Sequence, residues 1–317
     1  MLENFENGWI VFKQSLMVLG RYPKFLLPLV AWWALYALLV LYAQFFFPWS
    51  QYQLWACVAF VLVVVILWSA ALGIACLVML EMIRQIQADE PVNTTKAVVK
   101  VLEDDFARAL PITLVWSLLH VILGMIQGLG QKGEGEGSGG RLSPQSAAET
   151  LANYDPHFGL WDLLFQSSKA ALMMVVFLIL PAIAWEGLWP VEATKKGLHI
   201  LKAHLSVFAS GFVLTQMAGI AVFIPISILI TLAQVHIPVS DSIWYAAILY
   251  SGLAVTLVLF LEQMFAAQLY LWHLRWVKVA ESAKASGQPL PKFRDVAEPV
   301  IFPGTPNFLA LREFFDL

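Results

Sequence analysis

Six long apolar runs constrain this chain more than any other feature. A hydrophobic stretch of about 18 or more residues is long enough to cross the hydrocarbon core of a bilayer as a helix. The runs are Phe25–Phe47, Leu54–Leu80, Ala109–Gly130, Ala170–Trp185, Leu205–Ala233 and Ile243–Leu261. The mean hydropathy of +0.73 and the charged fraction of 13% agree with this reading, because a soluble domain needs more charge to cover its surface. We therefore predict an all-α polytopic membrane protein with six transmembrane helices.

Lysine and arginine residues concentrate in alternate loops between the predicted spans. They occur in the N-terminal segment, in the loops after the second and fourth spans, and in the C-terminal region. Only Lys132, Arg141 and Lys169 of the 19 fall on the other side. Because cytoplasmic loops carry an excess of positive residues, we expect both termini to be cytoplasmic.

Each cytoplasmic stretch before an odd-numbered span has apolar residues at helical spacing. The three stripes are Phe5, Trp9, Phe12, Leu16 and Leu19; Ala97, Val98, Val101 and Leu102; and Gly197, Leu198, Ile200 and Leu201. Helices with one apolar and one basic face lie naturally in the membrane interface. Packing on neighbouring helix ends is the alternative, and both can hold.

The sequence PVNTTK at residues 91–96 recurs as PVEATK at residues 190–195. A shift of 99 residues places Lys96 on Lys195, and a shift of 83 places Lys13 on Lys96. The same register thus holds at three equivalent points of the topology. It predicts three parallel units, approximately 1–80, 90–186 and 189–276, each an amphipathic interfacial helix followed by a helical hairpin.

Two segments differ in character from the predicted membrane domain, 1–276. The outer loop 131–168 begins with the Gly/Glu-rich sequence QKGEGEGSGG, which has little packing potential and is typical of a flexible linker. The region 277–317 is predicted to be a cytoplasmic, Pro-rich tail that docks on this protein or on a partner.

The sequence lacks the common catalytic signatures. It has no P-loop, no G-x-S-x-G and no H-E-x-x-H. His199 and His204 are five residues apart, which is about 140° around a helix, so a helical pair of metal ligands is not expected. We predict no catalytic residues, no cofactor and no metal.

Three acidic residues occur where even-numbered spans are predicted to reach the cytoplasm. Glu81, Glu186 and Glu262 are close in sequence to basic residues, among them Lys96 and Lys195. Such groups either line a polar cytoplasmic vestibule or form salt bridges to the amphipathic helices, and the second reading is favoured because charge is least costly at helix ends.

Two polar residues lie within the predicted spans, His120 in the third and Gln216 in the fifth. Either can form a hydrogen bond between helices or line a pathway, and the structural role is the simpler interpretation. Gly124 and Gly128 form a G-x-x-x-G step in the third span, which allows close helix packing.

The segments GWIVFKQSLMVLGRYPKFLLPLV (8–30) and LPAIAWEGLWPVEATKKGLHILKAH (180–204) resemble an uncharacterised bacterial family of six-span inner-membrane proteins. Similar helix–hairpin units occur in the membrane domain of some glycerophosphodiester phosphodiesterases. The resemblance covers about residues 1–275, whereas the Gly/Glu-rich loop and the long tail depart from it. It implies a fold and a location in the bacterial cytoplasmic (inner) membrane, and it brings no catalytic residues.

Two functional hypotheses follow. The first is a non-enzymatic integral inner-membrane protein that binds membrane lipids or partners. Its partners would be lipids, a second copy of the chain or another membrane protein, reached through the tail at 286–317, and no nucleic acid is expected. The alternative is a transporter or channel for a lipid-like or small hydrophobic substrate. An enzyme ranks last because no convergent set of nucleophile, base or metal ligands is visible.

Overall fold

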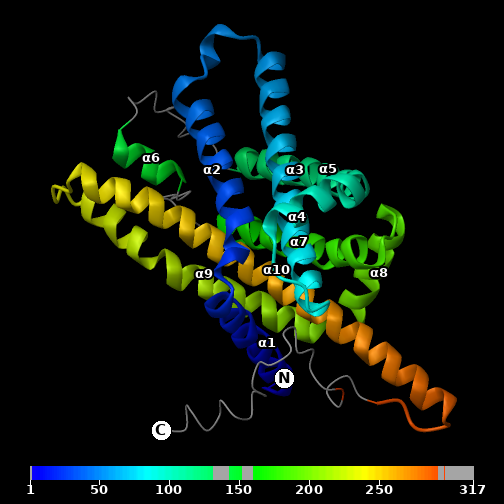
Figure 1. The fold of residues 1–317 in the computed structure, drawn as a ribbon. Coiled ribbons are helices and arrows are strands. Elements are labelled where there is room, and N and C mark those ends of the chain that lie inside the picture. The colour runs from blue at the N-terminus through cyan, green and yellow to red at the C-terminus, as the bar shows by residue number, and fades with distance from the viewer. Residues whose placement is uncertain (1, 131–142, 152–159, 292–295, 297–317) are drawn as a thin grey trace, which may run out of the picture.

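The computed structural model describes residues 2–130, 143–151, 160–291 and 296, and these residues form helices joined by short turns (Figure 1). Six helices in this part of the chain are long and apolar enough to cross a membrane. They are Pro23–Phe46, Leu54–Gln87, Thr94–Leu123, Phe165–Glu186, Leu205–Gln234 and Asp241–Ala285. The prediction of an all-helical chain with six candidate spans is confirmed.

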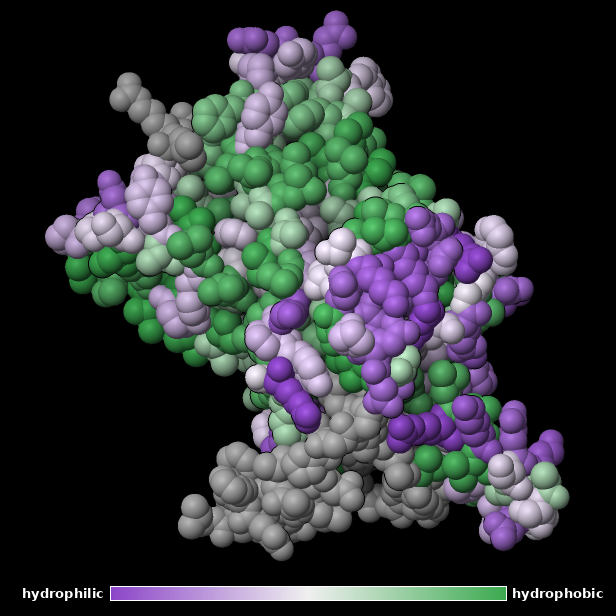
Figure 2. Space-filling view, in the orientation of Figure 1, coloured by the Kyte–Doolittle hydropathy of each residue, from purple (hydrophilic) through white to green (hydrophobic). Residues whose placement is uncertain are grey.

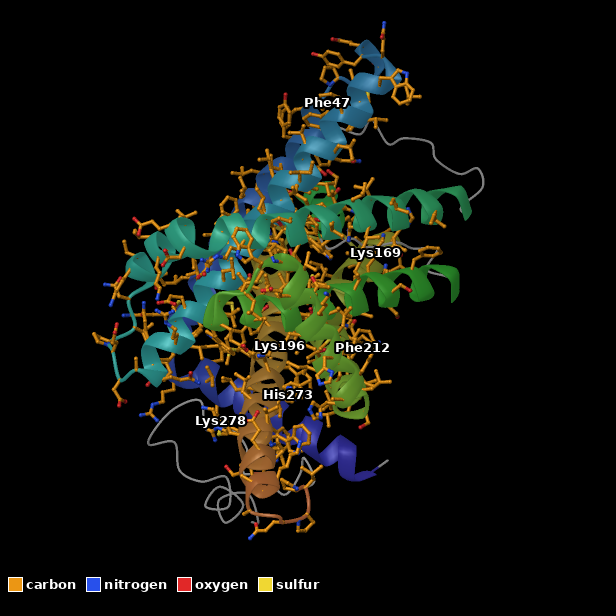
Figure 3. The ribbon with its side chains drawn as sticks, turned by 90° about the vertical axis from the view of Figure 1, so that its right-hand side faces the viewer. Phe47, Lys169, Lys196, Phe212, His273 and Lys278 are labelled. Carbon is orange, nitrogen blue, oxygen red and sulfur yellow. The ribbon has the colours of Figure 1, made fainter. Side chains whose placement is uncertain are left out.

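Consecutive spans pair into three hairpins. The first pairs α2 (Leu27–Leu41), with the short helical turns Pro23–Leu26 and Tyr42–Phe46 at its ends, with α3 (Leu54–Gln87). The second pairs α5 (Phe106–Gly130) with α7 (Leu160–Glu186), and the third pairs α9 (Leu205–Gln234) with α10 (Asp241–Ala285). Figures 1 and 3 show the hairpins pointing in different directions from one shared region, called the base below.

A short helix precedes each hairpin and packs on the hairpin that comes before it in the chain. Helix α4 (Thr94–Lys100) packs on α3, and α8 (Pro190–Ala203) packs on α7. Helix α1 (Leu2–Arg21) has no earlier hairpin, and it packs on α9 and α10 of the last one. The first and last parts of the chain are thereby joined, so the three hairpins and three short helices form a closed arrangement.

Glycines allow two of these short helices to approach closely. A Cβ atom on Gly8 of α1 would lie 2.4 Å from Oγ of Ser210 on α9. A Cβ atom on Gly197 of α8 would lie 2.7 Å from Cγ1 of Ile179 on α7. Real Cβ atoms are not found this close to their neighbours, so glycine at these positions sets the distance between the helices.

The helical geometry is irregular where each short helix meets its hairpin. Tyr22 has φ −132° and ψ 69°, and His204 has φ −126° and ψ 32°, so the chain breaks at both. The third junction is the π-helical segment Val101–Asp105, which leads from α4 into α5 without a break. Under shifts of 83 and 99 residues, Tyr22, Asp105 and His204 fall at the same place in the sequence.

The main core lies at the base, where the inner ends of α3, α7 and α10 meet. Its largest fully buried side chains include Phe177, Phe260, Phe265, Tyr270 and Trp272. The outer parts of the hairpins are exposed instead, with Leu54 at 74% and Trp55 at 79%. Figure 2 shows apolar residues over α2, α3 and α9, and hydrophilic residues gathered over α4 and the end of α3. Large exposed apolar side chains in this pattern match a surface in contact with lipid.

The boundaries of two predicted segments differ from the structure. The predicted outer loop 131–168 contains helix α6 (Pro144–Leu151), which packs on α10 and α2, and α7 already begins at Leu160. Ala147, Ala148 and Leu151 of α6 are buried, so this part of the predicted loop is packed. The Gly/Glu-rich stretch 131–140, whose composition predicts flexibility, lies outside the described residues. At the other end, α10 continues to Ala285, so the tail begins after the predicted boundary at 277.

Candidate functional site

Glu81 is held by two cations at the base. Its side chain is 4% exposed, with Oε1 3.2 Å from Nζ of Lys100 and Oε2 3.3 Å from Nε of Arg84. Lys96, the last residue of the first copy of the repeated motif, lies elsewhere and pairs with Glu90 at 2.6 Å. This hydrogen-bonded ammonium group lowers the pKa of the Glu90 carboxyl from its ordinary value.

Glu186, at the end of α7, joins three elements. Its carboxylate accepts a hydrogen bond from the Tyr270 hydroxyl of α10 and pairs with the ammonium group of Lys196 on α8. Lys195, which the sequence repeat singles out, is exposed on the outer side of α8. The acid is therefore paired with the neighbouring lysine, because one residue along a helix turns the side chain by about 100°.

Three histidines lie close together, although the sequence spacing of His199 and His204 argued against a shared face. Nε2 of His204 lies 2.9 Å from Nδ1 of His273, and the ring of His199 is 6.0 Å from that of His273. The expectation that His199 and His204 diverge assumed one continuous helix, whereas the chain breaks at His204. Burial, and then the nearby His273 and His199, lower the pKa of His204 to about 4.

Glu262, which was expected at the cytoplasmic end of the last span, is buried between helices. From Glu262, α10 runs on for more than six further turns to Ala285. Glu262 is 1% exposed, and its Oε1 accepts a hydrogen bond of 3.0 Å from Nε2 of Gln216 on α9. The two polar residues that the sequence placed in different groups thus form one buried pair.

Two further amides are buried along α10. Nε2 of Gln268 donates to Oγ of Ser15 on α1 at 3.1 Å, and Gln263 is fully buried. Neither Oε1 nor Nε2 of Gln263 has a hydrogen-bond partner among the described residues. Ser15 gave no signal in the sequence, because a serine on an amphipathic helix is common and its partner is distant in the chain.

The three glutamates do not form one ring. The ends of α3 and α7 are adjacent, since the indole nitrogen of Trp185 donates to the carbonyl oxygen of Leu80 at 3.1 Å. Glu81 and Glu186 follow these two residues directly, but each has its own cationic partner. Glu262 is about 12 Å further along α10 from Tyr270, the residue that reaches Glu186.

His120 belongs to an aromatic cluster between the first two hairpins. The cluster consists of Trp32, Tyr36, Trp68, Trp116 and His120. Sequence reasoning found His120 alone, because the rings come from three helices. Gly124 and Gly128 lie further along α5, but their packing is outside what the structure describes.

No group of three or more His, Cys, Asp and Glu side chains suited to a metal ion occurs among the described residues. The arrangement offers ion pairs at the base, a buried Glu–Gln pair between α9 and α10, and an aromatic cluster between α2, α3 and α5. Comparisons of the chain with protein-family models, with curated proteins and with solved structures find no match.

Proposed function

We propose that the chain is a non-enzymatic multi-pass protein of the bacterial inner membrane that binds membrane lipids. The observation that carries this proposal is the way in which the short helices distribute their side chains between a buried face and an outer face. Each buries small or apolar residues against a hairpin and exposes large apolar residues on its outer side. The exposed residues are Trp9 and Leu16 on α1, Val99 and Leu102 in and just after α4, and Trp189, Val191 and Leu198 at α8.

Helix α8 offers the most complete surface of this kind. Its first residues Pro190 and Val191 follow the exposed Trp189, and Lys195 and Lys202 are exposed on the same short helix. Apolar side chains that enter the acyl region beside lysines at the headgroups are the means by which interfacial helices hold anionic lipids. The parallel threefold repeat and cytoplasmic termini remain part of this proposal, supported by the matching positions of Tyr22, Asp105 and His204.

Lipid retention tests the proposal directly. The protein is purified from membranes, and the phosphatidylglycerol bound per chain is counted by native mass spectrometry. We expect the double variant Lys195→Gln, Lys202→Gln to retain less than the wild type. The variant Lys284→Gln, at the far end of α10, is the control because it also replaces a lysine by glutamine. It should retain as much phosphatidylglycerol as the wild type. Equal retention in all three proteins would refute the role of α8.

The transporter alternative is favoured by one observation, the buried pair of Glu262 and Gln216 between α9 and α10. An ionisable group in a membrane span marks a substrate or ion path by default. Proteoliposomes loaded with a fluorescent phospholipid distinguish the two functions. Transfer of the lipid between leaflets that Glu262→Gln abolishes would favour the transporter, and no transfer is expected for the lipid-binding function.

A further inference from the structure

The tail meets α10 at two tryptophans. Nε1 of Trp276 donates to the carbonyl oxygen of Pro291 at 3.0 Å, and Nε1 of Trp272 donates to that of Val296 at 3.1 Å. The two tryptophans are about one helical turn apart, so both face the tail from the same side of α10. Val296 is 7% exposed. This part of the tail is therefore packed on the helix at two points.

Trp276 also contacts a pair of buried histidines. Its ring centroid is 6.1 Å from that of His204 and 5.9 Å from that of His273. His204 lies at the break between α8 and α9, and His273 lies on α10 about one turn before Trp276. One tryptophan side chain thus connects the histidine pair to the tail.

The hydrogen bond between the histidines requires two neutral rings. Nε2 of His204 lies 2.9 Å from Nδ1 of His273, and the two residues are 6% and 3% exposed. In such a bond one ring nitrogen carries a proton and the other accepts it. A proton added to the accepting nitrogen would place two N–H groups against each other and break the bond. A proton added elsewhere on either ring would leave a charge in a buried place, which is costly.

The charges around the pair do not compensate a further positive charge. Lys196 of α8 acts on His273 electrostatically, and Figure 3 shows the two residues close together at the base. The carboxylate of Glu186 on α7 has the opposite sign, but it is already paired with Lys196 and hydrogen-bonded to Tyr270. His199 of α8 is exposed, with its ring 6.0 Å from that of His273.

The remaining neighbours of the pair are α10 itself and the tail. Arg275 is exposed and two residues from His273, so it lies about 200° around the helix from it. Pro291 and Val296 carry no charge and meet the indoles through backbone carbonyls. A proton taken up by the histidine pair would therefore be stabilised only if the pair separates and reaches water.

We propose that His204, His273 and Trp276 form a proton-sensitive latch, which holds the tail on α10 at neutral pH and releases it in mild acid. Repulsion between the protonated rings moves them apart, and Trp276 loses the surface against which it packs. Its bond to Pro291 is then lost, and the indole donors of α10 are uncovered. This regulation goes beyond the proposed lipid binding, because it acts on the tail and does not involve the exposed lysines of α8.

The direction of the pH dependence follows from linkage. Burial, and then the nearby His273 and His199, lower the pKa of His204 to about 4 while the latch is closed. In the open form the ring reaches water, where an imidazole has a pKa of about 6.5. The open form therefore binds the proton more tightly, and its population grows as pH falls from about 6.5 toward 4.

Two cysteine variants measure the release, with the full chain in nanodiscs and a Cys57→Ser background. Val296→Cys places a thiol at the packed contact, and Gln288→Cys places one at an exposed position of the same tail. Both react with dithiodipyridine, and the ratio of the rate at 296 to the rate at 288 removes the pH dependence of the reagent. Cys76 is fully buried in α3, so its reaction reports unfolding of the whole domain instead.

The ratio should rise roughly ten- to twentyfold between about pH 7 and about pH 5, as linkage gives for the shift of His204. His204→Gln and His273→Gln each remove one titrating ring of the pair and should hold the ratio constant over this range. His199→Gln is the matched control. It should keep the rise of the wild type, because its exposed ring is outside the hydrogen-bonded pair. Thermal unfolding midpoints at neutral pH check that each variant folds.

Three outcomes would overturn the proposal. The first is a wild-type ratio that stays constant between these pH values. The second is an equal rise in His204→Gln and His273→Gln, because this assigns the release to other groups. The third is reaction of Cys76 together with the tail, which indicates unfolding of the domain. Phosphatidylglycerol retention that depends on Lys195 and Lys202 is measured at neutral pH, so the proposed function can stand when the latch falls.

Discussion

Nε2 of Gln268 donates a 3.1 Å hydrogen bond to Oγ of Ser15, across 253 positions of the chain. The bond joins α10 to α1 inside the membrane domain, and both residues are fully buried. Oε1 of Gln268 has no partner among the described residues, so this single bond is the one that satisfies the amide there. It fastens the N-terminal helix to the last hairpin and closes the arrangement of hairpins.

Removing one partner of this bond should cost more than removing both. Ser15→Ala leaves the whole Gln268 amide buried without a partner, and we expect a loss of about 1–3 kcal/mol. Ser15→Ala combined with Gln268→Leu replaces the pair by apolar groups and should recover part of that loss. Chemical denaturation in mild detergent measures both. Strictly additive effects of the two substitutions would show that the bond contributes nothing.

The packing of α9 on α10 depends on Gly211. A Cβ atom there would lie 2.0 Å from the ring of Phe265, which is fully buried and has no room to move. Gly211→Ala should therefore destabilise the protein by about 1–3 kcal/mol through overpacking. Gly219→Ala on the same helix is the matched control, because its Cβ would be 3.5 Å from Val258, an ordinary contact. Comparable unfolding midpoints for the two variants would contradict the observed packing.

Hydropathy was enough to find the six spans, because membrane crossing is a property of local composition. Hydropathy did not identify which charged side chains pair with each other. The sequence drew attention to Lys96 and Lys195, whereas Lys100 and Lys196 hold the two acids. Lys196 is one residue from Lys195, which turns the side chain by about 100°, whereas Lys100 lies about one helical turn beyond Lys96. Neither motif fixes the phase or the axial position of its helix against another hairpin.

The same limit explains the histidines and the aromatic cluster. A continuous helix would separate His199 from His204, and only the break at His204 brings both toward His273. The rings around His120 come from α2, α3 and α5, so their contact depends on how the first two hairpins pack. Such contacts between distant segments carry no periodic signal in the sequence.

The stability of the protein should fall in mild acid because of His204. Its pKa is lowered to about 4 in the folded state, against about 6.5 when exposed. Between these values the unfolded chain binds the proton and the folded chain does not, so unfolding becomes easier as pH falls from 6.5 toward 4. Thermal unfolding at a series of pH values checks this. His204→Gln should flatten the slope in that window, and an unchanged slope would assign the acid sensitivity to other groups.

The predicted orientation can be measured by labelling single cysteines in intact cells, in a background of Cys57→Ser and Cys76→Ala. Gln51→Cys lies in the turn between α2 and α3, and Lys284→Cys lies in the last turn of α10. With cytoplasmic termini, a membrane-impermeant maleimide should label the first and spare the second until the cells are opened. The reverse pattern would invert the topology.

The tail is held on α10 by two indole donors. Nε1 of Trp272 donates to the carbonyl oxygen of Val296 at 3.1 Å, and Nε1 of Trp276 donates to that of Pro291 at 3.0 Å. Trp276→Phe keeps the ring and removes one bond of about 1 kcal/mol, so the tail should open about fivefold more often. Trypsin cleavage in the sequence PKFRD at 291–295 should accelerate by that factor. Trp189→Phe, an exposed tryptophan before α8, is the control, and equal cleavage rates would show that the indole bonds do not hold the tail.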